Sequence, residues 1–73
     1  MIEDISWDAT RGPLVGPSRA IVRVVYLYEE SYRNFIFEVL GVDFVDFWHA
    51  RKEKQSEIVR ARLEAYLSTR INK

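Results

Sequence analysis

Two kinds of hydrophobic pattern follow one another along the chain. Between Ala20 and Glu30 the sequence AIVRVVYLYEE is rich in β-branched and aromatic residues, which favour a β-strand. Both faces of this strand are largely apolar, so we expect the chain's own helix to cover one face and a second chain to cover the other. From Asp43 onward the apolar residues recur at intervals of three and four, which predicts helix.

The segment SYRNFIFEVLG, residues 31–41, fits both periodicities. As a strand it places Phe35, Phe37 and Val39 on one face, after a hairpin turn at the preceding EES. As a helix it gathers five apolar residues on one stripe and ends at Gly41, a typical C-terminal cap. The turn lacks Asn-Gly, which weakens the hairpin, and Phe-Ile-Phe is prone to β-structure, which weakens the helix. The strand is the favoured interpretation and the helix stays open as the alternative.

The first 18 residues predict a short edge strand followed by a loop. Both prolines follow glycines, in Gly12-Pro13 and Gly16-Pro17, and such pairs interrupt regular structure. A phosphate-binding loop is not favoured here, because no lysine follows the glycines and no strand–loop–helix pattern surrounds them.

The helical region, residues 43–70, is expected to begin at Asp43, which is a good N-cap. Polar Arg51 and Gln55 interrupt its apolar stripe, which leaves two alternatives. One unbroken helix would be about 40 Å long and would overhang a domain of this size. Otherwise the helix breaks near KEKQS, and Ser56 caps a second helix.

These elements predict one small α+β domain, with a small antiparallel β-sheet or hairpin packed on a long C-terminal helical region. A chain of 73 residues buries only a modest core, and without cysteine it has no disulfides. Self-association is therefore the expected source of added stability. With a single histidine, His49, and no cysteine, no Ser/His/Asp or Cys/His arrangement can be assembled, and a zinc site would need carboxylates for its other ligands, which is uncommon. We therefore expect no catalytic, metal or cofactor site and a protein that is not an enzyme.

Positive charge is concentrated at the C-terminal end of a neutral chain. Residues 1–50 contain four basic and eight acidic side chains, whereas residues 51–73 contain seven basic and three acidic ones. The candidate basic patch consists of Arg51, Lys52, Lys54 and Arg60. No apolar run approaches the length of a membrane span, and the acidic N-terminus lacks the features of a signal peptide, so we expect a cytoplasmic protein.

One stretch, SEIVRARLEAYL, resembles the second helix of the ribbon-helix-helix DNA-binding regulators. The matching residues are Ser56, Glu57, Ile58, Val59, Arg60, Leu63, Tyr66 and Leu67. The resemblance implies a dimer in which the apolar members pack between chains, and the start of this helix holds a DNA phosphate. It also implies a β-ribbon that reads the major groove. The chain departs from the family pattern because KEKQ stands where a glycine turn precedes the serine.

The interpretation that we favour is a non-catalytic module for protein–protein interaction or regulation, a small adaptor or inhibitor that forms a homodimer. The alternative is a dimeric DNA-binding regulator of the ribbon-helix-helix type, with nucleic acid as its partner. Neither interpretation involves a membrane. The candidate interface is apolar and aromatic, as interface cores are. It consists of Tyr26, Tyr28, Val59, Leu63 and Tyr66.

Overall fold

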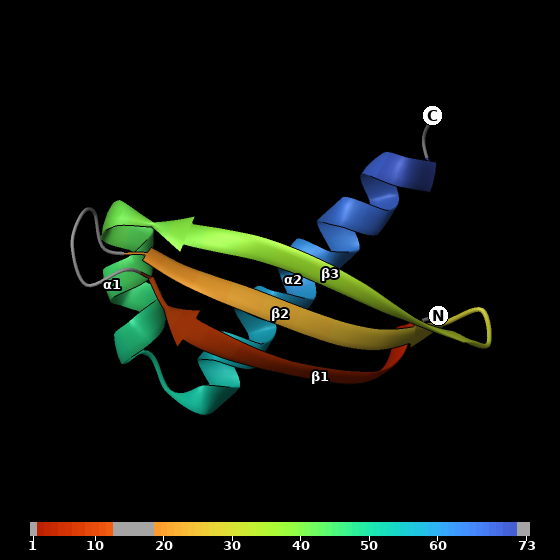
Figure 1. Ribbon diagram of the computed structural model, residues 1–73, viewed down its shortest axis with the longest axis horizontal. Helices are drawn as coiled ribbons and strands as arrows, with labels where there is room; N and C mark the ends of the chain where they lie inside the picture. The colour runs from red at the N-terminus through yellow and green to blue at the C-terminus, as the bar shows by residue number, and fades with distance from the viewer. Residues whose placement is uncertain (1, 13–18, 72–73) are drawn as a thin grey trace.

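The computed structural model describes residues 2–12 and 19–71 and shows an α+β domain of three strands followed by two helices (Figure 1). Most of the expected Gly/Pro loop, residues 13–18, lies outside the described residues. The elements are β1 (Ile2–Arg11), β2 (Arg19–Tyr28), β3 (Ser31–Leu40), α1 (Gly41–His49) and α2 (Lys52–Ile71).

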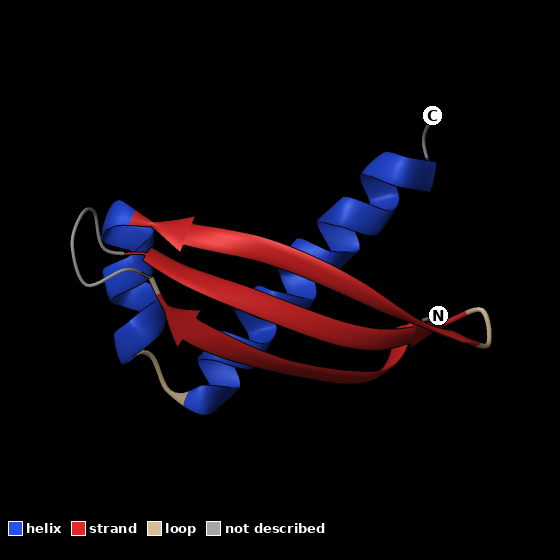
Figure 2. Cartoon of the chain, in the orientation of Figure 1, coloured by secondary structure: helices blue, strands red, loops and turns tan. Residues whose placement is uncertain are grey.

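The three strands form an antiparallel sheet in the order β1-β2-β3, so β2 is central and the other two strands are its edges (Figure 2). The pairing of β2 with β3 is continuous from Arg19 opposite Leu40 to Tyr28 opposite Ser31. The pairing of β1 with β2 shifts between Glu3 and Ser6. A β-bulge therefore bends β1 near its beginning.

Residues 31–40 form a strand, which confirms the favoured interpretation of this ambiguous segment. The hairpin turn between β2 and β3 consists of Glu29 and Glu30, with φ of 52° and 65°. Positive φ at both central residues is the mark of a type I′ turn, which suits the twist of paired strands. The strand pairing thus imposes this turn on two residues that do not prefer it.

Helix α1 begins at Gly41, so the prediction of Asp43 as its N-cap is wrong. Leu40 precedes the helix in extended conformation and makes no side-chain cap hydrogen bond. Gly41 has φ of 59°, a conformation that costs other residues energy, and this lets the chain turn sharply from β3 into α1. Asp43 lies in the first turn instead, where its charge complements the helix dipole.

The helical region consists of two helices, and the break lies at Ala50 and Arg51 rather than within KEKQS. Ala50 is extended, with ψ of 158°, and its N–H donates to the Phe47 carbonyl at 3.2 Å. The Gln55 side-chain amide donates to the same carbonyl at 2.8 Å. Gln55 is polar on an otherwise apolar stripe because it caps the end of α1. Ser56 lies in the second turn of α2, not at its N-cap.

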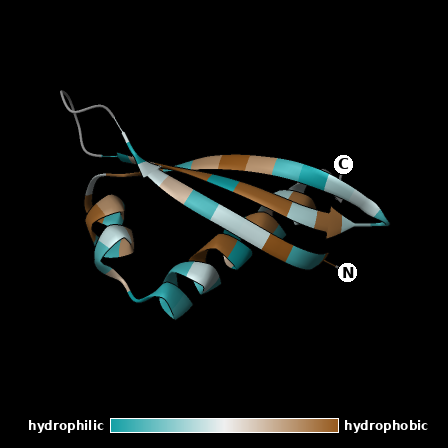
Figure 3. Cartoon of the chain, turned by 60° about the horizontal axis from the view of Figure 1, so that its bottom comes forward, coloured by the Kyte–Doolittle hydropathy of each residue, from teal (hydrophilic) through white to brown (hydrophobic). Residues whose placement is uncertain are grey.

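Both helices lie on the same side of the sheet (Figure 3). The core between these two layers is entirely hydrophobic in the described part of the chain. Tyr66 of α2 stacks on Phe35 of β3 with ring centroids 4.5 Å apart, and Trp7 of β1 lies 6.0 Å from Phe47 of α1. The buried residues are Ala20, Val22, Val24, Tyr26, Phe37, Val39, Phe44, Phe47, Val59, Leu63 and Leu67.

The molecule is flat and elongated, because α2 crosses beneath the sheet diagonally. Its extents are 39 × 26 × 16 Å, and its radius of gyration of 13.0 Å exceeds the roughly 11 Å of a compact domain of this length. The C-terminal turns of α2 pass beyond the edge formed by β3 (Figure 1).

Candidate interaction surface

The sheet face opposite the helices has no covering layer in the described part of the chain (Figure 3). Residues directly opposite in antiparallel strands share a face, so the register groups this surface into rows across the three strands. We call it the open face. Its rows are Glu3–Leu27–Tyr32, Ser6–Val25–Asn34, Asp8–Arg23–Ile36 and Thr10–Ile21–Glu38.

Large apolar side chains on the open face remain in contact with solvent. Val25 is 39% exposed, Ile36 is 60% exposed and Tyr32 is 66% exposed. They alternate with polar side chains, and Arg23 lies at the centre with Asp8 paired beside it. At one end Arg19 forms an ion pair with Glu38 at 3.6 Å. The open face therefore combines apolar area with polar and charged groups, as non-obligate protein interfaces do.

One hydrogen bond crosses the end of this face from one edge strand to the other. The Tyr32 hydroxyl of β3 donates to Asp4 Oδ2 at 3.0 Å, and Asp4 lies in the β1 bulge with φ of 50°. This hydrogen bond, together with the negative charge of Asp4, raises the pKa of Tyr32 above its ordinary value. The phenol thus stays protonated as a donor and joins the two edges.

The predicted interface does not lie on the surface, and this prediction needs correction. Tyr26, Val59 and Leu63 are buried in the core of a single chain, and Tyr28 and Tyr66 are half-buried at its margin. The reason is the direction of β2, whose even-numbered residues face the helices. One sequence signal that distinguishes the two faces is Arg23, a charged residue in the odd-numbered set.

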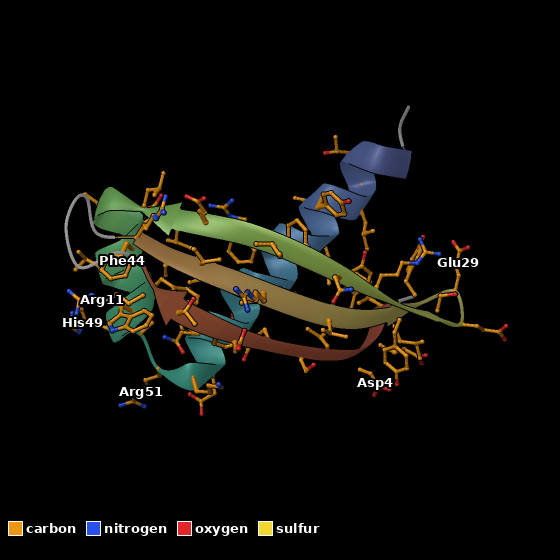
Figure 4. All side chains as sticks on the ribbon, viewed as in Figure 1. Asp4, Arg11, Glu29, Phe44, His49 and Arg51 are labelled. Carbon is orange, nitrogen blue, oxygen red and sulfur yellow. The ribbon has the colours of Figure 1, made fainter. Side chains whose placement is uncertain are left out.

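The four residues of the predicted basic patch do not form one surface. Lys52 lies over the Trp7 ring with Nζ 4.3 Å from its centroid, and Arg60 forms an ion pair with Glu64 at 3.4 Å. Arg51 lies in the connection between the helices, as Figure 4 shows. Lys54 lines a surface hollow of about 390 Å³, and the other three residues of the predicted patch do not line it.

That hollow lies between β3, α1 and α2, and its lining includes two carboxylates and two cations on an apolar floor. Asp43 and Asp46 come from α1, and Lys54 and Arg62 come from α2. Arg62 also lies over the Phe37 ring, 5.2 Å from its centroid. The opposite charges compensate one another, so the hollow offers no strong field to a charged ligand.

Ser56, the first residue of the ribbon-helix-helix resemblance, has a contact within the chain. Its hydroxyl oxygen accepts a hydrogen bond of 3.3 Å from the Trp7 indole. Because Ser56 lies inside α2, its position differs from that of a serine at a helix N-terminus, where free backbone N–H groups hold a phosphate. In this chain Ser56 helps to attach β1 to α2.

His49 is exposed at the end of α1 (Figure 4). The Arg11 guanidinium lies 5.8 Å from the centroid of the Phe44 ring. Among the described residues, no three histidine, cysteine or acidic side chains are grouped closely enough to hold a metal ion.

No protein-family model, curated protein or solved structure matches the chain. Within residues 2–12 and 19–71, neither helix is both long and apolar enough to cross a lipid bilayer.

Proposed function

We propose that this protein is a non-catalytic module for protein–protein interaction or regulation, and that it binds a protein partner through the open face of its sheet. The observation that carries this proposal is the exposure of Val25, Tyr32 and Ile36 on a face that no described residue outside the sheet covers. Apolar groups that remain exposed together on a small domain favour contact with another macromolecule. The surrounding polar side chains supply hydrogen-bonding groups that fix the orientation of a partner.

The charge of the open face supports a protein partner over nucleic acid. Three carboxylates belong to its rows, Glu3, Asp8 and Glu38, whereas its cations are Arg19 and Arg23. A surface that binds DNA needs an excess of positive charge, because contacts to phosphates supply most of the affinity. Among the described residues of this face, no row across the strands consists of basic side chains, which are the electrostatic mark of a surface that binds nucleic acid.

A capture experiment with matched variants tests the proposal. Val25→Lys places a charge in the middle of the open face, at a position that is already partly exposed. Val45→Lys is the control, because Val45 is 50% exposed on α1, away from that face. Immobilised protein is incubated with nuclease-treated lysate, and bound proteins are quantified. Binding should persist with Val45→Lys and fall with Val25→Lys, while equal capture by both variants contradicts the proposal.

The DNA-binding alternative has its own test. Fluorescence anisotropy with duplex DNA at ~0.15 M salt should show binding weaker than ~10⁻⁶ M, the tight end of the non-specific range. The double change Arg51→Glu, Lys54→Glu should leave this result unaltered. Sub-micromolar binding that weakens with salt and disappears in the double variant would favour the DNA-binding regulator instead.

A further inference from the structure

The two edges of the sheet differ in a way that bears on self-association. Edge strands expose unpaired backbone groups, and proteins protect them with bulges and charged residues. β1 has both, because its bulge lies between Glu3 and Ser6 and it carries acidic side chains. β3 has no bulge in its pairing with β2 over ten residues, and it contains neither proline nor glycine. Its outer edge has no neighbouring strand among the described residues.

The side chains that β3 presents on the open face form a symmetric series. Tyr32, Asn34, Ile36, Glu38 and Leu40 alternate between apolar and polar, with Ile36 at the centre. The three apolar members are exposed, including Leu40 at 54%. Because this apolar/polar pattern is the same in both directions, antiparallel pairing of the strand with its own copy can place like against like.

We infer that two copies of this chain pair antiparallel through their β3 edges, with Ile36 opposite Ile36, to give one continuous six-stranded sheet. In this register Tyr32 lies opposite Leu40 of the second copy. Asn34 lies opposite Glu38 of the second copy, where its amide can donate to the carboxylate. Each apolar side chain of the series meets an apolar one, and each polar side chain meets a polar one.

The two neighbouring registers do not achieve this match. Opposite residues of an antiparallel pair share a face. The residue opposite any given β3 residue can therefore change only in steps of two if the helices of both copies are to stay on the same side of the joined sheet. Centring the pair on Phe35 puts Tyr32 opposite Glu38 and Asn34 opposite Ile36. Centring it on Phe37 puts Ile36 opposite Glu38. Both alternatives place apolar groups against a carboxylate or an amide.

The position of α2 agrees with the same interface. Its last turns extend past the β3 edge, on the side where the second copy would lie (Figure 1). A two-fold axis at Ile36 brings the two α2 helices together antiparallel beneath the joined sheet. Ala61 and Ala65 of α2 are exposed, and small side chains allow two helices to approach closely.

The available area indicates a dimer of modest strength. Ten strand residues span about 33 Å, and the molecule is 16 Å thick along its shortest axis. An edge of this length and thickness would bury roughly 500 Å² per copy, or roughly 1,000 Å² in total. This area is at the lower end for a specific interface. We therefore expect dissociation in the micromolar range.

The test uses the Asn34–Glu38 pair, measured by sedimentation equilibrium over a dilution series. Wild-type protein should approach twice the 8.7 kDa chain mass at high concentration. Asn34→Glu places two carboxylates opposite each other twice in the dimer, and should raise the dissociation constant at least tenfold. Adding Glu38→Gln exchanges the roles of amide and carboxylate and should restore it to within about threefold of wild type.

This rescue distinguishes contact between copies from effects within one chain. Asn34 and Glu38 are about 13 Å apart along their own strand, too far for direct contact. Ser6→Lys serves as the control, because Ser6 is exposed on β1, at the opposite edge of the sheet, and its change should leave the dimer intact. Far-ultraviolet circular dichroism verifies that each variant is folded.

Three results would overturn the inference: a wild-type monomer throughout, no effect of Asn34→Glu, or no rescue by Glu38→Gln. Failure here leaves the proposed function standing, because that proposal is scored by the capture of a partner and not by the mass of the protein alone.

Discussion

At the scale of single residues, the hairpin turn has a backbone conformation that its two glutamates do not favour. Glu29 and Glu30 both have positive φ, which residues other than glycine and asparagine adopt at a cost. The double change Glu29→Asn, Glu30→Gly should therefore raise the free energy of unfolding by about 1 kcal/mol. Urea denaturation measures this change.

Gly41→Ala is the reciprocal control for the turn variant. Gly41 has φ of 59° and no atom within 4 Å of an added Cβ, so conformation alone should lower stability, by about 1 kcal/mol. A stability gain from alanine at this position, or a loss from Asn-Gly in the turn, would contradict the backbone geometry described above.

The Tyr32–Asp4 hydrogen bond predicts a pH dependence. Because the pKa of Tyr32 is raised in the folded state, the associated stability is complete below the unfolded value near ~10 and is lost as pH rises through the folded value. Ultraviolet titration should show the Tyr32 pKa fall in Asp4→Asn, which removes the charge of the acceptor. An identical tyrosine titration in both proteins would show that the hydrogen bond is absent in solution.

At the scale of elements, α2 is a packing helix and Leu63 lies at its centre. Leu63 and Val59 are fully buried in one chain, and Leu67 is 8% exposed. Leu63→Ala should lower the free energy of unfolding by about 2–5 kcal/mol through lost burial and a cavity. Ala61→Ser, on an exposed position of the same helix, should change it by less than about 0.5 kcal/mol. A small effect of Leu63→Ala with dissociation of a dimer would instead place Leu63 between chains.

The elements themselves were largely predictable from the pattern of apolar residues. The β-branched and aromatic content of residues 20–30 identified β2, the same kind of content favoured a strand for residues 31–40, and apolar residues at intervals of three and four identified the helical region. A break near KEKQS was one of the two alternatives, but its position at Ala50 and Arg51 was not predicted, because it depends on the Gln55 side chain reaching the Phe47 carbonyl. Gln55 was visible as a polar interruption, but its partner is a backbone atom that sequence periodicity does not reveal.

At the scale of the whole molecule, the difficult question was which face of β2 the helices cover. Both faces are apolar in sequence, and the tyrosines drew the predicted interface to Tyr26 and Tyr28 on the wrong face. Which face the helices cover depends on packing between residues far apart in the sequence, and the pattern along a single strand does not reveal this packing. Arg19 and Arg23, both on the odd-numbered side, were the sequence features that indicated the exposed face.

The central claim, that a partner covers the open face, is tested most directly by hydroxyl-radical footprinting of the protein alone and in complex with a captured partner. Protein concentration is held constant so that self-association does not change. Tyr32 is 66% exposed in the single chain, so its labelling reports on this face, whereas Trp48 reports on the helix side. We predict that the partner lowers labelling of Tyr32 several-fold and leaves Trp48 unchanged. Protection of Trp48 with unchanged labelling of Tyr32 would contradict the account.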